Sequence, residues 1–161
     1  MPKICEYIIA LLLVIIPMIT SAQDVDKTLP SVFMMGENPQ EFENLIMTRK
    51  SLLVDVYENN MLLASERLKE LLTAIDDYSE EIDFDIKGLK LWLHVFWNED
   101  GTIEHLTYYP KPNSAKIEYN ELTAFFKSFV NNHDSSMIAD FKFAHQFSGF
   151  FPYGGKLNVK K

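Results

Sequence analysis

The chain has 161 residues, of which 15 are basic and 23 acidic, so its net charge is −8. This balance argues against nucleic-acid binding, which depends on Lys and Arg side chains neutralising phosphates, and against adhesion to anionic lipid. The single cysteine, Cys5, excludes a disulfide framework and a thiolate zinc site.

The first 22 residues have the layout of a secretory signal peptide. Lys3 supplies the positive start, residues 8–16 form an unbroken apolar run, and residues 20–22 are small. The run is about half the length that a membrane-spanning helix needs, roughly 20 residues. We therefore expect cleavage before Gln23 and export to the periplasm or the outside of a bacterium, with no transmembrane span left after cleavage.

The remaining chain divides into an arm and one domain. Residues 23–40 show little periodicity and contain turn-forming residues, so they are expected to form an N-terminal arm or linker. Residues 41–161 are expected to form a single α+β domain. Within it, residues 51–57 fit the spacing of a helix and of a strand equally well, and the choice stays open.

Two helices are predicted from apolar residues at helical spacing. Residues 61–79 form the first, and Asn59 or Asn60 can cap it by accepting a hydrogen bond from a free backbone N–H. The second covers about residues 119–131 and is rich in phenylalanine.

Between the helices, two strands rich in β-branched and aromatic residues cover 90–97 and 102–109. Residues 98–101 separate them and end on Gly101, which accepts the positive φ that such a turn requires, so a β-hairpin is predicted. Residues 141–147 suit a last strand. The order helix, strand, strand, helix, strand predicts an α+β fold, with a small antiparallel sheet built on the central hairpin and both helices packed on one face.

An uninterrupted hairpin assigns its side chains to two faces. Trp97 would pair with Ile103, and Trp92 with Tyr108. Because side chains alternate along a strand, the more aliphatic face, with Leu93 and Val95, is expected under the helices. The other face mixes aromatic rings with polar tips, as contact surfaces do. Its candidate partner-binding residues are Trp92, His94, Phe96, Leu106 and Tyr108. The alternative is that this face is covered by the chain itself, through the arm before Phe42 or the aromatic segment 150–153.

The hairpin with its following helix, LKLWLHVFWNEDGTIEHLTYY and NELTAFFKSFV, resembles the C-terminal domain of TonB-type energy transducers. The resemblance extends over about residues 61–147. It implies a periplasmic domain that binds an outer-membrane protein by adding a strand at a sheet edge. The chain lacks a recognisable anchor and Pro-rich linker, and residues 141–155 do not match the Trp-x-Pro-type segment of that family. The resemblance therefore implies a stand-alone secreted relative.

No catalytic, cofactor or metal signature is present in the sequence. The hairpin register puts His94 and His105 on opposite faces, and no H-E-x-x-H spacing occurs. The expected function is therefore non-enzymatic: an envelope domain that binds a protein or peptide through the aromatic face or through an edge strand at residues 141–147, with its oligomeric state open. The alternatives are a small secreted hydrolase using His94 or His145 with an acid, and a purely structural envelope protein.

Overall fold

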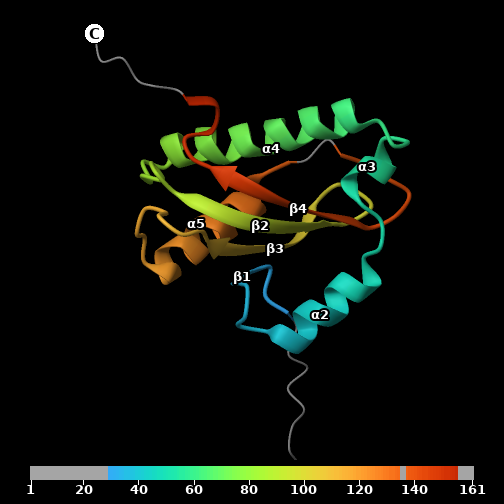
Figure 1. Ribbon diagram of the computed structural model, residues 1–161, viewed down its shortest axis with the longest axis horizontal. Coiled ribbons are helices and arrows are strands. Elements are labelled where there is room, and N and C mark those ends of the chain that lie inside the picture. The colour runs from blue at the N-terminus through green and yellow to red at the C-terminus, as the bar shows by residue number, and fades with distance from the viewer. Residues whose placement is uncertain (1–28, 135–136, 156–161) are drawn as a thin grey trace, which may run out of the picture.

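The computed structural model describes residues 29–134 and 137–155, so the expected signal peptide at 1–22 lies outside the described residues. The described part has the α+β fold that the sequence predicts (Figure 1). In chain order its elements are β1 (Val32–Met34), α2 (Pro39–Thr48), α3 (Leu53–Val56), α4 (Met61–Glu81), β2 (Lys90–Trp97), β3 (Ile103–Pro110), α5 (Tyr119–Asn132), β4 (Phe143–Phe150) and the 3-10 turn η1 (Tyr153–Gly155).

The sheet has the strand order β1-β3-β2-β4. Strand β2 pairs antiparallel with both β3 and β4, as expected for a sheet built on the hairpin, but β1 pairs parallel with β3. The sheet is therefore mixed rather than antiparallel. The added strand comes from residues 23–40, which the sequence predicts to be an arm or linker. With three residues, β1 is too short for an alternating pattern to reveal it.

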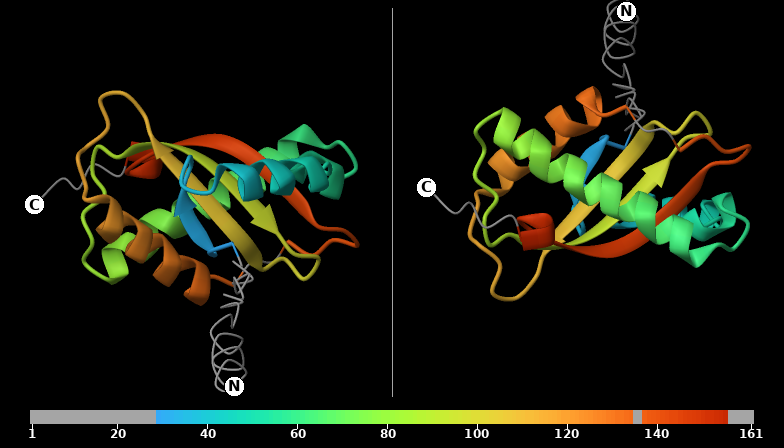
Figure 2. Two further views of the ribbon diagram at one scale, coloured as in Figure 1. Left: turned by 90° about the horizontal axis from the view of Figure 1, so that it is seen from below. Right: turned by 90° about the horizontal axis from the view of Figure 1, so that it is seen from above.

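Helices α4 and α5 cover one face of the sheet, which we call the helix face (Figure 2, right). Asn60 caps α4, because its side-chain oxygen accepts a hydrogen bond from the Leu63 N–H at 3.2 Å. The helices bury apolar stripes against Leu93 and Val95, which are fully buried. These stripes consist of Ala64, Leu71, Leu72 and Ile75 in α4, and Leu122, Phe125, Phe126 and Phe129 in α5. Both predicted helices are confirmed, and so is the expected position of Leu93 and Val95 under them.

The opposite face, which we call the second face, is partly covered by α2 (Figure 2, left). Leu45 of α2 packs with Phe96 and Ala144. Phe42, also in α2, meets the ring of Phe33 of β1 edge-on, with centroids 6.1 Å apart. The chain's own N-terminal segment thus covers a part of this face.

Residues 51–57 contain both conformations that their spacing left open. Leu52 forms an isolated parallel bridge with Ala144 of β4, and the Ala144 N–H donates to the Ser51 carbonyl at 2.9 Å. The short helix α3 begins at the next residue. This segment therefore covers the outer side of β4 near its start.

The hairpin turn forms as predicted, but the strands that leave it do not pair as expected. The Asn98 N–H donates to the Thr102 carbonyl at 2.9 Å, and Gly101 has a φ of 84°. Trp97 pairs with Ile103, as expected, but Phe96 then pairs with His105. Glu104 between them has no partner on β2, which makes it a β-bulge.

The bulge shifts every later pair by one residue, so the expected register is wrong beyond Ile103. Leu106 lies opposite Val95 and Tyr108 opposite Leu93, on the helix face, and both are fully buried. The Tyr108 hydroxyl shares a 2.6 Å hydrogen bond with the Thr123 hydroxyl of α5. A one-residue change of register moves side chains to the other face of a strand, and here it brings Leu106 and Tyr108 into the core.

Candidate functional site

Of the five candidate partner-binding residues, three lie on the second face: Trp92, His94 and Phe96. Phe96 is fully buried under α2. His94 is half-buried, with its ring centroid 4.3 Å from that of Phe96 and 5.8 Å from that of Phe42. Trp92 alone among them is exposed, to 37%. The predicted binding surface is therefore reduced to its Trp92 end.

Two aromatic residues that the sequence analysis did not select lie beside Trp92. Tyr109, its cross-strand partner on β3, is 47% exposed, and Phe150 at the end of β4 is 50% exposed. The rings of Trp92 and Tyr109 are tilted by 31° with centroids 6.1 Å apart. We call Trp92, Tyr109, Phe150 and the nearby Lys111 the aromatic end. Tyr109 reaches this face only because of the bulge, and no residue type in the strand predicts that bulge.

Lys111 connects these rings. Its ammonium lies 5.1 Å from the centroid of the Trp92 ring and 4.7 Å from that of Phe150, so it makes cation–π contacts with both. It also donates a hydrogen bond of 2.7 Å to the Ser148 hydroxyl of β4. Across residues 29–134 and 137–155, Lys111 forms no ion pair with a carboxylate. The aromatic end therefore combines three partly exposed rings with one cation.

Strand β4 is an edge of the sheet, and the part next to the aromatic end has an open outer side. Ala144 directs its N–H outward, to Ser51, whereas Phe151 donates inward, to Leu89. Because residues two apart on a strand direct their backbone groups to the same side, Gln146, Ser148 and Phe150 also point outward. No other described residue hydrogen-bonds to their outward backbone groups. Three successive N–H and C=O pairs are thus available at this edge.

Comparisons with models of protein families, with curated proteins and with solved structures found no match for this chain. Across the described residues, no helix has both the length and the apolar content of a membrane span.

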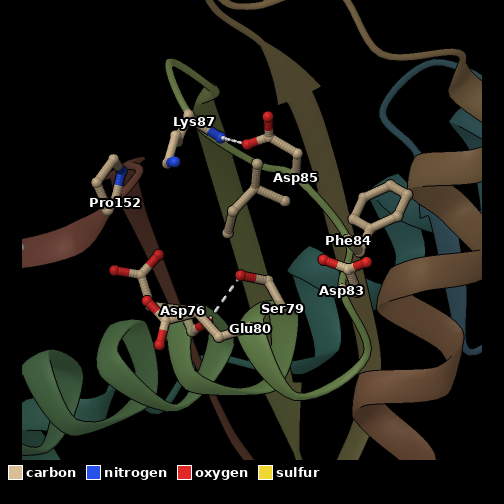
Figure 3. A pocket seen from close by; sticks show the side chains of 9 residues that line it. Asp76, Ser79, Glu80, Asp83, Phe84, Asp85, Lys87 and Pro152 are labelled. Carbon is tan, nitrogen blue, oxygen red and sulfur yellow. Dashed lines mark hydrogen bonds between the residues drawn. The ribbon is translucent and has the colours of Figure 1, made fainter. Parts of the chain in front are cut away.

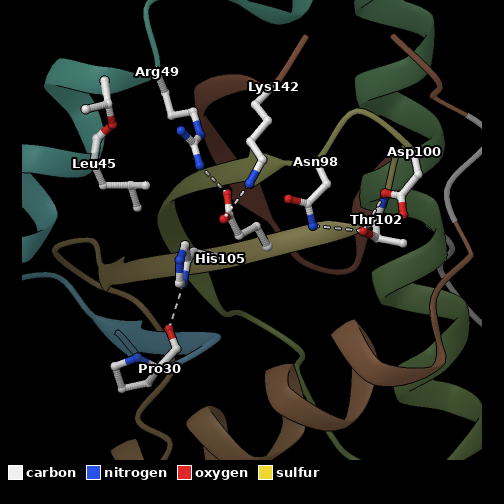
Figure 4. Close-up of polar contacts among 10 residues, drawn as sticks. Pro30, Leu45, Arg49, Asn98, Asp100, Thr102, His105 and Lys142 are labelled. Atoms are coloured by element: carbon white, nitrogen blue, oxygen red, sulfur yellow. Dashed lines mark hydrogen bonds and ion pairs between the residues drawn. The ribbon is translucent and has the colours of Figure 1, made fainter. Parts of the chain in front are cut away.

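An ion-pair cluster fixes α2 over the other part of the second face (Figure 4). Glu104 accepts hydrogen bonds from Arg49 at the end of α2, at 2.6 Å, and from Lys142 just before β4, at 2.9 Å. His105 Nδ1 lies 2.9 Å from the Pro30 carbonyl oxygen. This contact holds the segment before β1 against β3. The bulge residue therefore holds the cover in place, and the aromatic end lies beyond it.

The four histidines lie on β2, on β3, at the end of α5 and on β4. The register places His94 and His105 on the same face, contrary to expectation, but on different strands and in different contacts. Burial, and to a smaller extent the charge of His145, lowers the pKa of His94 to about 4. Burial also lowers the pKa of His145. Within the described part of the chain, no three His, Cys, Asp or Glu side chains are placed to hold a metal ion.

A hollow of about 320 Å³ lies between the end of α4 and the loop before β2 (Figure 3). Acidic side chains line much of it, among them Glu80 and Asp85. Asp76 is buried there and accepts a hydrogen bond from the Tyr153 backbone N–H. Because this bond joins α4 to the segment after β4, Asp76 has a structural role in holding that segment.

Proposed function

We propose that this protein is an exported domain that binds an extended segment of another protein. The segment adds to the outer edge of β4 at residues 146–150, and its side chains contact the aromatic end. The observation that carries the proposal is that the open edge and the exposed rings adjoin: Phe150 belongs to both, and Ser148 of the edge contacts Lys111.

The two features supply different parts of recognition. An added strand gains main-chain hydrogen bonds that do not depend on sequence, and pockets for its alternate side chains give specificity. Gln146, Ser148 and Phe150 offer these main-chain groups. Trp92 and Tyr109 offer apolar area at low entropic cost, and an aromatic anchor that a partner fully desolvates contributes on the order of 2 kcal/mol.

Export is part of the same proposal. The order of charged, apolar and small residues over 1–22 supports a signal peptide cleaved before Gln23. The resemblance to the C-terminal domain of TonB-type transducers supports a periplasmic or extracellular setting in a bacterium. N-terminal sequencing of the protein secreted by its host tests this part, and a mature product that begins at Met1 contradicts it.

The binding proposal is tested with a phage-display library of random nine-residue peptides. Peptides are selected for binding to the protein without residues 1–22. Selected peptides are expected to shift the backbone amide NMR signals of Gln146, Ser148 and Phe150, and not those of β1. Phe150→Ala should weaken their binding about tenfold, which corresponds to about 1.4 kcal/mol.

A proline variant separates strand addition from simple surface contact. Proline has no N–H and is tolerated on an edge strand where that N–H faces solvent. Gln146→Pro should therefore keep the fold and lose peptide binding, whereas the matched Gln146→Ala variant should keep both. Equal binding by the two variants rules out strand addition at this edge, and a library that yields no binder contradicts the proposed function.

A further inference from the structure

We infer that Lys111 selects an acidic side chain at one position of the bound segment, the position opposite Ser148. The inference rests on the proposed function and specifies the partner: an extended segment with Asp or Glu at that position. The observation that supports it is that the Lys111 ammonium hydrogen-bonds to Ser148, a residue of the open edge itself.

The register of an added strand fixes which side chain meets Lys111. Ser148 is the middle one of the three residues whose backbone groups point outward. In a paired strand, the residue directly opposite Ser148 has its side chain on the same face, with the two Cβ atoms about 5 Å apart. The ammonium of Lys111 is 2.7 Å from the Ser148 hydroxyl on that face. A carboxylate opposite Ser148 is therefore within reach of this ammonium.

The Lys111 ammonium has free N–H donors for a carboxylate of the bound segment. An ammonium has three N–H donors, and Ser148 takes one of them. Among the other cations of the described residues, Arg49 and Lys142 pair with Glu104, and Arg67 pairs with Glu70. Lys111 lacks a carboxylate although the chain carries an excess of acidic residues. Its remaining donors can therefore bind a carboxylate that a bound segment supplies.

The surrounding rings strengthen the selectivity. Trp92 and Phe150 hold the ammonium by cation–π contacts and keep water from part of its surface. A charge pair in such surroundings is stronger than one in open solvent, because the effective dielectric constant is lower. An apolar residue opposite Ser148 would displace water from the Lys111 ammonium without giving it a hydrogen-bond acceptor, which is unfavourable.

The carboxylate is assigned to a side chain rather than to a chain terminus. The open edge continues on both sides of Ser148, through Gln146 and Phe150, so the residue opposite Ser148 lies in the interior of the bound segment. A second copy of the chain is disfavoured as the partner. Its β4 contains no acidic residue to place opposite Ser148, and the net charge of −8 opposes self-association.

The test is a selection of nine-residue peptides by the wild-type protein and, separately, by Lys111→Met, which keeps an unbranched apolar stem over the rings. Wild-type selection is expected to enrich Asp or Glu at one fixed position, and Lys111→Met selection is not. Replacing that residue by its amide should weaken binding to wild type about tenfold and leave binding to Lys111→Met unchanged. Lys116→Met, which alters an exposed lysine outside the aromatic end, should keep the wild-type preference.

The outcomes separate the inference from the proposed function. Binders that lack an acidic preference overturn the inference alone, and so does a preference that C-terminal amidation of the peptide abolishes. Absence of any binder overturns the proposed function and the inference with it. If Lys111→Met does not fold, as judged by circular dichroism, the acid-to-amide replacement measured on wild type still decides.

Discussion

Arg49, at the end of α2, donates a hydrogen bond of 2.6 Å to Glu104, the bulge residue of β3. Both side chains are largely shielded from solvent, with 17% and 25% of their surfaces exposed. Lys142 binds the other carboxylate oxygen of Glu104. One carboxylate therefore joins α2, the hairpin and the start of β4, and it keeps α2 against the second face.

Glu104→Gln should destabilise the protein by about 2 kcal/mol, because the amide keeps one acceptor oxygen, its NH2 cannot accept from the second cation, and both cations lose their counter-charge. Urea unfolding measures the loss. Glu70→Gln is the matched control, since it breaks an exposed pair with Arg67, and pairs of that kind contribute at most about 1 kcal/mol. Equal losses in the two variants contradict a special role for Glu104.

The contribution of Glu104 should also depend on pH. Partial burial raises the pKa of Glu104, but the hydrogen bonds and charges of Arg49 and Lys142 outweigh burial and hold the pKa below its ordinary value. The stabilisation is thus fully present above about pH 4.5 and is lost as the pH falls through the lowered pKa. The gap in unfolding free energy between wild type and Glu104→Gln should close over that acidic range. A gap of constant size down to pH 2 contradicts this.

Leu93→Asp should prevent folding, because Leu93 is fully buried between β3, β4 and the helices, and an unpaired carboxylate there is strongly unfavourable. Tyr109→Asp is the control on the other face, where 47% of the side chain is exposed, and its effect should be about 1 kcal/mol or less. Thermal melting compares the two. A melting temperature of Leu93→Asp close to that of wild type means that the faces of β2 are assigned wrongly.

The sequence predicts the helices, the hairpin turn and the last strand because each depends on local signals: apolar residues every three or four positions, an Asn cap, and a glycine at a positive φ. The bulge at Glu104 has no such signal. Glu104 bulges where it can reach Arg49 and Lys142, which are distant in sequence. Strand β1 also depends on distant contacts, since Val32 and Phe33 are buried only when β3 and α2 are in place.

The candidate site is likewise predictable from the sequence only where it depends on local signals. Trp92 follows from alternation within β2 alone, and its exposure agrees with the expected surface. The expected pairing of Trp92 with Tyr108 puts Tyr109 on the helix face, because it counts residues through the bulge as though all were paired. Lys111 and Phe150 come together only through the pairing of β2 with β4, which joins residues 46 (Trp97 and Phe143) to 60 (Lys90 and Phe150) positions apart and leaves no periodic pattern.

Acidification from pH 6.5 to 4 should destabilise the protein in part through His94. Its pKa is lowered from an ordinary value of 6.5 to about 4, so the unfolded chain binds a proton in this range that the folded protein does not. The limiting slope for one proton is about 1.4 kcal/mol per pH unit, and solvent screening of this half-buried ring reduces it.

His94→Phe preserves the aromatic contacts with Phe42 and Phe96 and removes the titrating group. The variant should therefore lose less stability than wild type between pH 6.5 and 4, measured by urea unfolding at several pH values. The pKa values of His133 and His145 are also lowered by burial, so the variant should keep part of the trend. Identical slopes for the two proteins contradict the assignment to His94.

The two tryptophans should differ sharply in their access to solvent, which reports directly whether the aromatic end is open. Trp92 is 37% exposed, whereas Trp97 is fully buried and stacks on Phe143 with centroids 5.0 Å apart. In Trp97→Phe, where Trp92 is the only tryptophan, fluorescence should be red-shifted and readily quenched by acrylamide. In Trp92→Phe, emission should be blue-shifted and resist quenching.

Trp97→Phe is a tolerable change, because it keeps an aromatic ring against Phe143 and removes an indole N–H that finds no acceptor among the described residues. A peptide that adds to β4 should then reduce the quenching of Trp92 in this variant. The comparison therefore tests both the free and the bound state with one probe. If Trp92 in the free protein is shielded as well as Trp97, the aromatic end belongs to the protein interior and docking through its rings has to be abandoned.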